Sequence, residues 1–159
     1  MSEAPHDARA IPLAPTGWLP PRFFVLLLAL GSAAHLMLGG PALLRAAWLG
    51  APLVLLGVAL ALWGSRTFAG AGAAIRPTER STLLVTQGPF RFSRNPMYLG
   101  MIVTLAGVAL VLGSPAPWLA ALAMALLLRF RFIANEERAL AVSLGEPYLA
   151  YKRRVRRWL

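Results

Sequence analysis

The amino-acid sequence predicts an all-α integral membrane protein with four transmembrane helices. Of its 159 residues, 58% are hydrophobic and 14% are charged, and the mean hydropathy is +0.62. This balance is too apolar for a soluble domain, in which about 25% of the residues are charged. The apolar residues form four stretches bounded by turn residues or charges, at residues 22–38, 43–68, 96–112 and 117–135. Each stretch is about as long as a helix that crosses a hydrocarbon core of about 30 Å.

The first apolar stretch, 22–38, follows a leader of residues 1–21 and ends at Gly39-Gly40-Pro41, a sequence typical of a turn. With its flanks it is near the minimum length for a span. The small residues Ser32-Ala33-Ala34 leave a cleaved signal peptide open as an alternative. The long leader with its prolines is atypical of a signal peptide, so we expect four retained spans.

The second and third stretches contain small residues at helical spacing. Small side chains let membrane helices approach closely, which matters because no hydrophobic effect drives helices together in lipid. These residues are Gly57, Ala61 and Gly64 in the second stretch and Gly100, Thr104 and Gly107 in the third. We therefore expect both helices to pack closely against their neighbours.

Sequence signals also mark the ends of the third and fourth helices. Asn95-Pro96 places an N-cap side chain before a proline at the first helical position, and Gly113-Ser114-Pro115 ends that helix. After Pro117, neither glycine nor proline occurs until Gly145. At 1.5 Å per residue this stretch is about 40 Å long, so its last turns extend beyond a core of about 30 Å. A C-terminal segment, 136–159, then begins at the membrane interface.

The basic residues are distributed unevenly around the four stretches. Two lie before or at the start of the first stretch, five lie from the end of the second stretch to the start of the third, and eight follow from Arg129 onward, whereas Arg45 alone falls on the other side. The positive-inside rule therefore places both termini, the central loop and the segment 136–159 in the cytoplasm. We expect a multi-pass protein of the bacterial inner membrane. The net charge of +10 is a topology signal, and nucleic-acid binding is disfavoured because it requires a soluble domain with a basic face.

Two polar islands interrupt the apolar pattern, at residues 88–100 and 135–138. If the helices run antiparallel, both islands fall at the same membrane surface and can face one another. The second island holds two adjacent glutamates at the end of a long apolar helix, which costs stability unless a cation pairs with them. We therefore expect either a function for this pair or an ion pair with Arg94 or Arg138. Taken alone, arginines at a membrane surface are more often snorkelling anchors.

The polar islands and the C-terminal segment resemble the isoprenylcysteine carboxyl methyltransferase and phospholipid methyltransferase superfamily. The similar motifs, in chain order, are Gly88-Pro89-Phe90-Arg91, Arg94-Asn95-Pro96-Met97-Tyr98-Leu99-Gly100, Glu136-Glu137-Arg138, and Gly145-Glu146 with Tyr148 and Tyr151. The resemblance implies an integral membrane enzyme that transfers a methyl group from S-adenosyl-L-methionine to a lipophilic or membrane-embedded acceptor. By resemblance, the cofactor-binding residues are Gly88, Pro89, Arg94, Asn95, Pro96, Tyr98, Gly100, Glu136 and Glu137, and the catalytic residues are Arg94 and Glu137.

The chemistry of S-adenosylmethionine suits these residue types. Arg94, just before the start of a helix, would favour the anionic carboxylate of the cofactor. The two glutamates would accept hydrogen bonds from its ammonium group or its ribose hydroxyls. Aromatic side chains that are candidates to flank the adenine are Phe90, Phe92, Tyr98, Tyr148 and Tyr151. A carboxylate acceptor needs no general base, whereas an amine or a thiol does, and Glu137 or Tyr98 is then the nearest candidate.

Two other functions stay open from the sequence alone. A membrane reductase of the sterol-reductase type has a similar Gly-x-x-Tyr-x-x-Tyr arrangement, here Gly145, Tyr148 and Tyr151, and would bind NADPH. A non-enzymatic scaffold would use the basic tail, residues 152–157, to bind anionic lipid head groups at about 1 kcal/mol per basic residue. We expect no metal site, because the chain has no cysteine and its two histidines are far apart.

Overall fold

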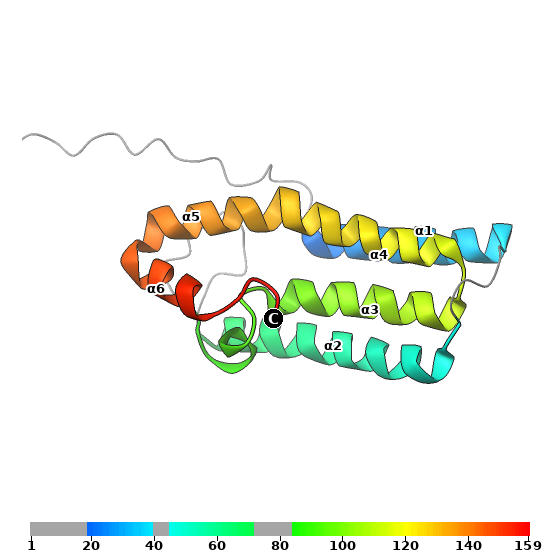
Figure 1. Ribbon diagram of the computed structural model, residues 1–159, viewed down its shortest axis with the longest axis horizontal. Helices are drawn as coiled ribbons and strands as arrows, with labels where there is room; N and C mark the ends of the chain where they lie inside the picture. The colour runs from blue at the N-terminus through cyan, green and yellow to red at the C-terminus, as the bar shows by residue number, and fades with distance from the viewer. Residues whose placement is uncertain (1–18, 40–44, 72–83) are drawn as a thin grey trace, which may run out of the picture.

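The computed structural model describes residues 19–39, 45–71 and 84–159 of the chain. Throughout these ranges the regular structure is helical, as the sequence predicts. Four helices lie alongside one another in a bundle, and two more continue beyond one end of it (Figure 1). The bundle helices are α1 (Pro20–Leu38), α2 (Ala47–Gly70), α3 (Pro96–Leu112) and α4 (Pro115–Leu127), and the others are α5 (Ala134–Leu144) and α6 (Glu146–Arg154).

Three helices are long and apolar enough to cross a membrane by length and composition. They are α1, α2 and the continuous helix Pro115–Leu144, which includes α4 and α5. With 17 residues, α3 is apolar but shorter than these three. The structure therefore contains three candidate spans within the described residues, and the four spans stay a prediction. Residues 1–18 of the predicted tail, the start of the predicted second span at 43–44, and the central-loop residues 72–83 lie outside the described residues.

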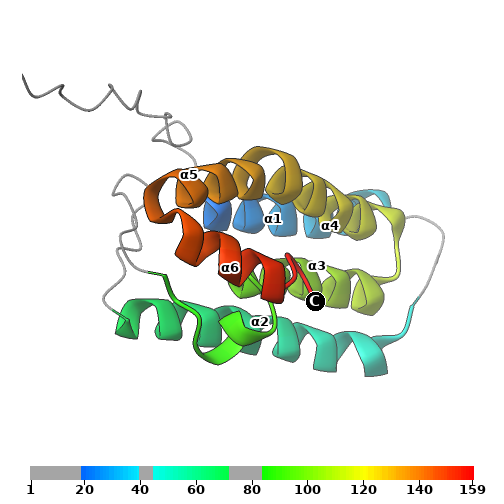
Figure 2. The same ribbon diagram turned by 60° about the vertical axis from the view of Figure 1, so that its left-hand side comes forward.

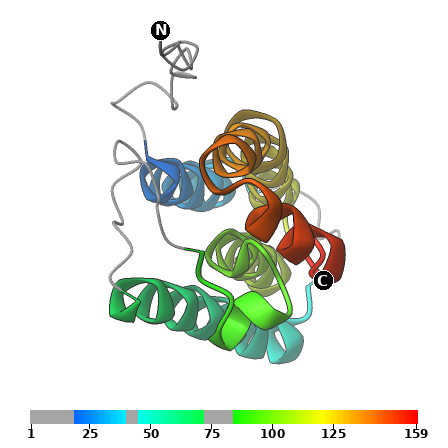
Figure 3. The ribbon, with the colours of Figure 1, turned by 90° about the vertical axis from the view of Figure 1, so that its left-hand side faces the viewer.

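The third helix occupies the middle of the bundle. It packs most extensively against α2 and also contacts α4 and α1, while α1 packs mainly on α4 (Figure 3). The buried apolar core lies where α3, α4 and the segment after α4 meet, and it contains Leu105, Met124, Leu128 and Ile133.

The contact between α2 and α3 brings the two backbones together. A Cβ atom added to Gly57 would lie 2.5 Å from the backbone N of Thr104, and one added to Gly100 would lie 2.5 Å from the backbone O of Gly57. No side-chain carbon fits at such distances, so these positions require glycine. The close packing predicted from the small residues is confirmed for these two helices.

Helix boundaries agree with the predicted ones at α3 but not at α4. As predicted, α3 has Asn95 at its N-cap and Pro96 as its first residue. In contrast, α4 begins at Pro115, so that Pro117 lies inside its first turn instead of before the helix. A proline is tolerated there, because the amides of the first turn have no intrahelical acceptor to lose.

The long helix predicted from Pro117 to Gly145 is continuous, but it is not α-helical throughout. Residues Leu128–Ile133 form a π-helical segment, η2, between α4 and α5. A π turn closes on the fifth residue instead of the fourth, so it rotates the face that α5 presents relative to α4. Phe132 in this segment is buried, and its ring meets that of Phe23 on α1 at a centroid distance of 5.9 Å. Such segments often occur at functional sites.

The last helix folds back along the end of the bundle. Gly145, with φ +59°, ends α5 and starts α6, as the glycine in the sequence predicts. From there α6 turns back, so that the C-terminus lies beside the start of α3 (Figure 1 and Figure 2). A short 3₁₀ turn before α3, η1 (Gly88–Arg91), lies at this same end and packs on α2.

Candidate functional site

The two polar islands meet at one end of the bundle. The Tyr98 hydroxyl donates a hydrogen bond of 2.5 Å to Oε1 of Glu136, and Nη2 of Arg94 lies 3.1 Å from Oε1 of Glu137. The prediction that the islands face one another is confirmed by these two contacts. We call Arg94, Tyr98, Glu136, Glu137 and the tail residue Arg157 the polar cluster.

Glu137 is the buried centre of the polar cluster. Its side chain is 8% exposed and accepts two hydrogen bonds from Arg157, from Nε to Oε1 at 2.9 Å and from Nη2 to Oε2 at 2.8 Å. Lys152 Nζ lies 3.6 Å from Oε2, so three cations, with Arg94 as the third, surround one carboxylate. A buried carboxylate needs such partners to offset its lost hydration. The surplus of positive charge makes the surroundings of Glu137 attractive to an additional anion.

Of the two arginines expected to pair with the glutamates, Arg94 pairs with Glu137, whereas Arg138 has other partners. Arg138 is exposed, and its guanidinium donates to the backbone O of Ala134 at 3.1 Å and to Oδ1 of Asn135 at 2.9 Å. Both acceptors lie on the same helix as Arg138, three and four residues before it. These local contacts point its side chain along α5, away from the glutamates.

Arg94 has donors to spare. Its side chain is 9% exposed, and among the described residues its buried Nε and Nη1 atoms have no hydrogen-bond partner. A buried donor without an acceptor costs about 1–3 kcal/mol, so this guanidinium is poised for an anion. Arginine is well suited to that role because its donors match the two oxygens of a carboxylate.

The C-terminal residues lie across the start of α3. The backbone N of Arg94 donates to the backbone O of Arg156 at 3.0 Å, and Asn95 Nδ2 donates to the backbone O of Arg157 at 3.1 Å. Asn95 therefore stands at the N-cap position without the capping hydrogen bond that the sequence predicts, because its side chain binds the tail instead. Ser93 Oγ also donates to Arg157 O, at 3.3 Å.

The sequence does not predict that Arg157 belongs to this site. From its composition, the basic tail, residues 152–157, predicts only lipid binding. No sequence feature separates Arg157 from the other arginines of the tail. In the fold, the side chain of Arg157 is 32% exposed, compared with 64% for Arg153, which pairs with Glu146 at the surface. Arg157 differs from Arg153 because α6 folds back and places the residues after it beside the start of α3.

Two tyrosines of α6 support the cluster. Tyr148 and Tyr151 are both buried, with ring centroids 6.4 Å apart, and the Tyr151 hydroxyl donates to the backbone O of Phe90 at 2.7 Å. Burial raises the pKa of Tyr151 to about 12, and burial together with the charge of Glu137 raises the pKa of Tyr148. Both phenols therefore stay neutral at physiological pH. Tyr151 ties α6 to η1, which explains part of the Gly-x-x-Tyr-x-x-Tyr arrangement structurally.

Three of the other predicted site residues, Gly88, Pro89 and Gly100, determine how the backbone packs and lie outside the polar cluster. Gly88 has φ +56°, and a Cβ there would lie 2.9 Å from Oγ1 of Thr67. Pro89 is buried in η1, and Gly100 lies in the contact with α2, away from the polar cluster. Of the predicted aromatic residues, Phe90 is buried against Phe68, while Phe92 is 66% exposed. Of the predicted site residues, the structure brings together Arg94, Asn95, Tyr98, Glu136 and Glu137. Pro96 is the first residue of α3 at this same end of the bundle.

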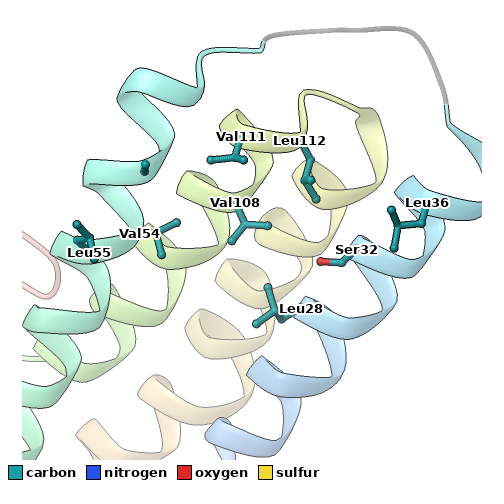
Figure 4. A pocket seen from close by; sticks show the side chains of 9 residues that line it. Leu28, Ser32, Leu36, Val54, Leu55, Val108, Val111 and Leu112 are labelled. Atoms are coloured by element: carbon teal, nitrogen blue, oxygen red, sulfur yellow. The ribbon is translucent and has the colours of Figure 1, made fainter.

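A separate hollow of about 650 Å³ lies toward the opposite end of α3 (Figure 4). It opens between α1 and α2, and its described lining residues are apolar apart from Ser32. Val108 and Leu112, near the C-terminal end of α3, form part of its wall. Because the polar cluster adjoins the first residues of α3, this hollow and the cluster are distinct features.

Comparison with known proteins identifies the family. The family model described as phospholipid methyltransferase matches residues 45–146, which include both polar islands. An uncharacterized protein of Haemophilus influenzae is 38% identical over 63 residues, which are 40% of this chain and the whole of that protein. No solved structure matches the chain significantly. The helical fold, the apolar helices and the family match agree with the resemblance carried by the motifs. The chain belongs to the phospholipid methyltransferase family, whose name denotes a membrane methyltransferase.

Proposed function

We propose that the protein transfers a methyl group from S-adenosylmethionine to a lipophilic or membrane-embedded acceptor at the cytoplasmic surface of the membrane. The family match supports methyl transfer in a membrane. The main structural support is the buried guanidinium of Arg94. Its Nε and Nη1 have no partner among the described residues, while its Nη2 lies 3.1 Å from the carboxylate of Glu137. A zwitterionic amino-acid group needs this combination of charges.

The residues of the polar cluster fit the amino-acid end of the cofactor. The spare donors of Arg94 suit its carboxylate, and the start of α3 adds the favourable field of a helix N-terminus. Glu136 is only partly buried and its partner is a neutral phenol, so its carboxylate suits the ammonium group or a ribose hydroxyl. Glu137 is already occupied by cations and instead holds Arg94 in place.

When bound, S-adenosylmethionine supplies its methyl group from a sulfonium cation. The protein's main contribution to such a displacement is to align the donor with the acceptor. A carboxylate beside the sulfonium stabilises the bound cofactor more than the transition state, in which that charge is being lost. Glu136, which we assign to the ammonium group or a ribose hydroxyl, faces groups whose charge does not change in the reaction. With an acceptor that needs no base, its loss should therefore weaken cofactor binding more than it slows the bound enzyme.

The acceptor decides whether a base is needed. A carboxylate acceptor requires none, whereas an amine or a thiol must lose a proton. Glu137 is a poor base in this fold, because Arg94 and Arg157 stabilise its charged form. The hydrogen-bonded pair of Tyr98 and Glu136 is the better candidate, since neither member is paired with a cation in the described contacts.

Calorimetric titration of the detergent-purified protein with S-adenosylhomocysteine tests the proposal. We expect micromolar affinity, a loss of at least tenfold in Arg94→Gln, and little change in the matched variant Arg91→Gln, which removes the same charge from an exposed position. NADPH serves as the comparison ligand. Binding of NADPH without binding of S-adenosylhomocysteine would refute the proposal and favour a reductase, and binding of neither by folded protein would favour a scaffold.

A further inference from the structure

We propose that Arg157 is a positioning residue that keeps Arg94 available for the carboxylate of the cofactor. This inference rests on the proposed function and adds a residue of the C-terminal tail to that site. Arg157 lies outside the range that the family model matches, which ends at residue 146.

Arg157 and Arg94 share the two carboxylate oxygens of Glu137 unequally. Arg157 binds both of them with a two-pronged pair at 2.9 and 2.8 Å. Arg94 reaches Oε1 with Nη2 only, at 3.1 Å. The two-pronged geometry is the stronger form of an arginine–carboxylate pair, so Arg157 is the principal partner of Glu137.

The buried carboxylate of Glu137 needs a cationic partner, because burying an unpaired charge is costly. If Arg157 were absent, the buried carboxylate of Glu137 would lose its principal partner, and breaking such a pair is strongly unfavourable. Arg94 is the nearest buried cation that can replace it, and it would do so by forming its own two-pronged pair. That pair would use Nε or Nη1, the donors that we assign to the cofactor.

Backbone hydrogen bonds hold the C-terminal residues against the start of α3. The backbone O of Arg157 accepts from Asn95 and Ser93, and the backbone O of Arg156 accepts from Arg94 N. Next to them, Trp158 packs against the apolar core. The backbone of Arg157 is therefore held against residues 93–95, just before α3, so that the side chains of Arg157 and Arg94 reach Glu137 from adjoining pieces of backbone.

The test compares S-adenosylmethionine with its decarboxylated form, which retains the ammonium group and lacks only the carboxylate. The readout is the ratio of the two dissociation constants, measured by calorimetry without an acceptor. In the unaltered protein we expect a preference of about tenfold or more for the carboxylated ligand. In Arg157→Gln this preference should fall to the level of Arg94→Gln. The exposed neighbour Arg154, changed to Gln with the same loss of charge, should leave the preference unchanged.

A merely structural role of Arg157 would weaken both ligands equally, and an unchanged ratio in Arg157→Gln would overturn the inference. If that variant fails to fold, Arg157→Lys decides. An ammonium keeps the charge but lacks the planar, two-pronged geometry of a guanidinium, so this change should lower the ratio partly. An unaltered protein that binds both ligands equally would also overturn the inference while leaving the cofactor in place. An unaltered protein that binds neither would refute the proposed function itself.

Discussion

The contact between α2 and α3 and the polar cluster at the end of the bundle are built on opposite principles. The helix contact uses glycines, has no side-chain charge, and brings backbones so close that a Cβ at Gly57 would meet a backbone atom at 2.5 Å. In the polar cluster, the buried carboxylate of Glu137 on α5 meets Arg94, just before α3, and Arg157 of the tail, and Lys152 of α6 lies beside it as a third cation. The first is a steric fit between two neighbouring helices, and the second is an electrostatic balance among distant parts of the chain.

The helix contact contributes to stability, whereas we expect the polar cluster to contribute to function. Close packing gains contacts without desolvating charge, whereas a buried ion cluster must first offset the hydration of every group in it. An arrangement that costs this much, and that leaves two donors of Arg94 without partners among the described residues, is expected where a ligand completes it. Variants in the two regions should therefore differ in both the size and the kind of their effects.

The largest effect is expected from removing the charge at the centre of the cluster. Glu137→Gln leaves three cations close together without their carboxylate, and we expect a loss of about 3–5 kcal/mol in the free energy of unfolding. The loss is measured by denaturant unfolding in detergent. Glu146→Gln is the control, because its pair with Arg153 is exposed and worth about 0–1 kcal/mol. Equal losses in the two variants would contradict the central role of Glu137.

A smaller loss is expected from a clash between α2 and α3. Gly57→Val inserts a side chain where Thr104 already lies, which should destabilise the protein by about 1–3 kcal/mol and reduce ligand affinity only through unfolding. Gly70→Val, at the end of α2, is the matched control, since a Cβ there meets no atom within 4 Å. The same denaturant unfolding checks both, and a Gly57 variant as stable as the control would mean that the helices can separate without cost.

A smaller effect is expected from removing the hydrogen bond between Tyr98 and Glu136. Tyr98→Phe removes the donor to Glu136 Oε1, and we expect a loss of about 1 kcal/mol in stability. The affinity for S-adenosylhomocysteine should fall several-fold in the same variant, because the released carboxylate no longer has a fixed orientation. Calorimetry and unfolding on the same preparation separate the two effects. Unchanged affinity in a stable Tyr98 variant would remove Tyr98 and Glu136 from the proposed site.

The smallest effect is expected from removing one charge of the basic C-terminal tail, residues 152–157. Arg154→Gln removes an exposed charge, and each basic residue near an anionic surface contributes about 1 kcal/mol to lipid binding. Sedimentation with vesicles of phosphatidylcholine and phosphatidylglycerol, using a soluble fusion of residues 146–159, should show weaker binding for this variant than for the unaltered tail. Equal binding of both fusions would show that the tail does not bind anionic lipid through this residue.

The sequence predicts the parts of this fold that depend on local chemistry. The Asn95-Pro96 start of α3, the end of α5 at Gly145 and the glycine spacing in α2 each follow from the conformations that those residues favour. The meeting of the two polar islands also follows, because antiparallel helices return the chain to the same end of a bundle.

Other features depend on tertiary contacts that no local pattern encodes. The π-helical segment has the ordinary sequence Leu128–Ile133, and it is held by packing against α1 and the core. Arg157 is one of several similar arginines until α6 folds back and places it on Glu137. The N-cap role of Asn95 fails for the same reason, since its side chain binds the tail that the fold brings to it.

The location of the cofactor is the most direct test of this account. Labelled S-adenosylmethionine can be cross-linked to the detergent-purified protein by ultraviolet light, and the labelled peptides can be identified by mass spectrometry. We expect the label on peptides from residues 88–100 or 135–151, and we expect excess S-adenosylhomocysteine to abolish it. Label confined to the peptides that line the apolar hollow, or label that excess S-adenosylhomocysteine fails to remove, would contradict a cofactor site at the polar cluster.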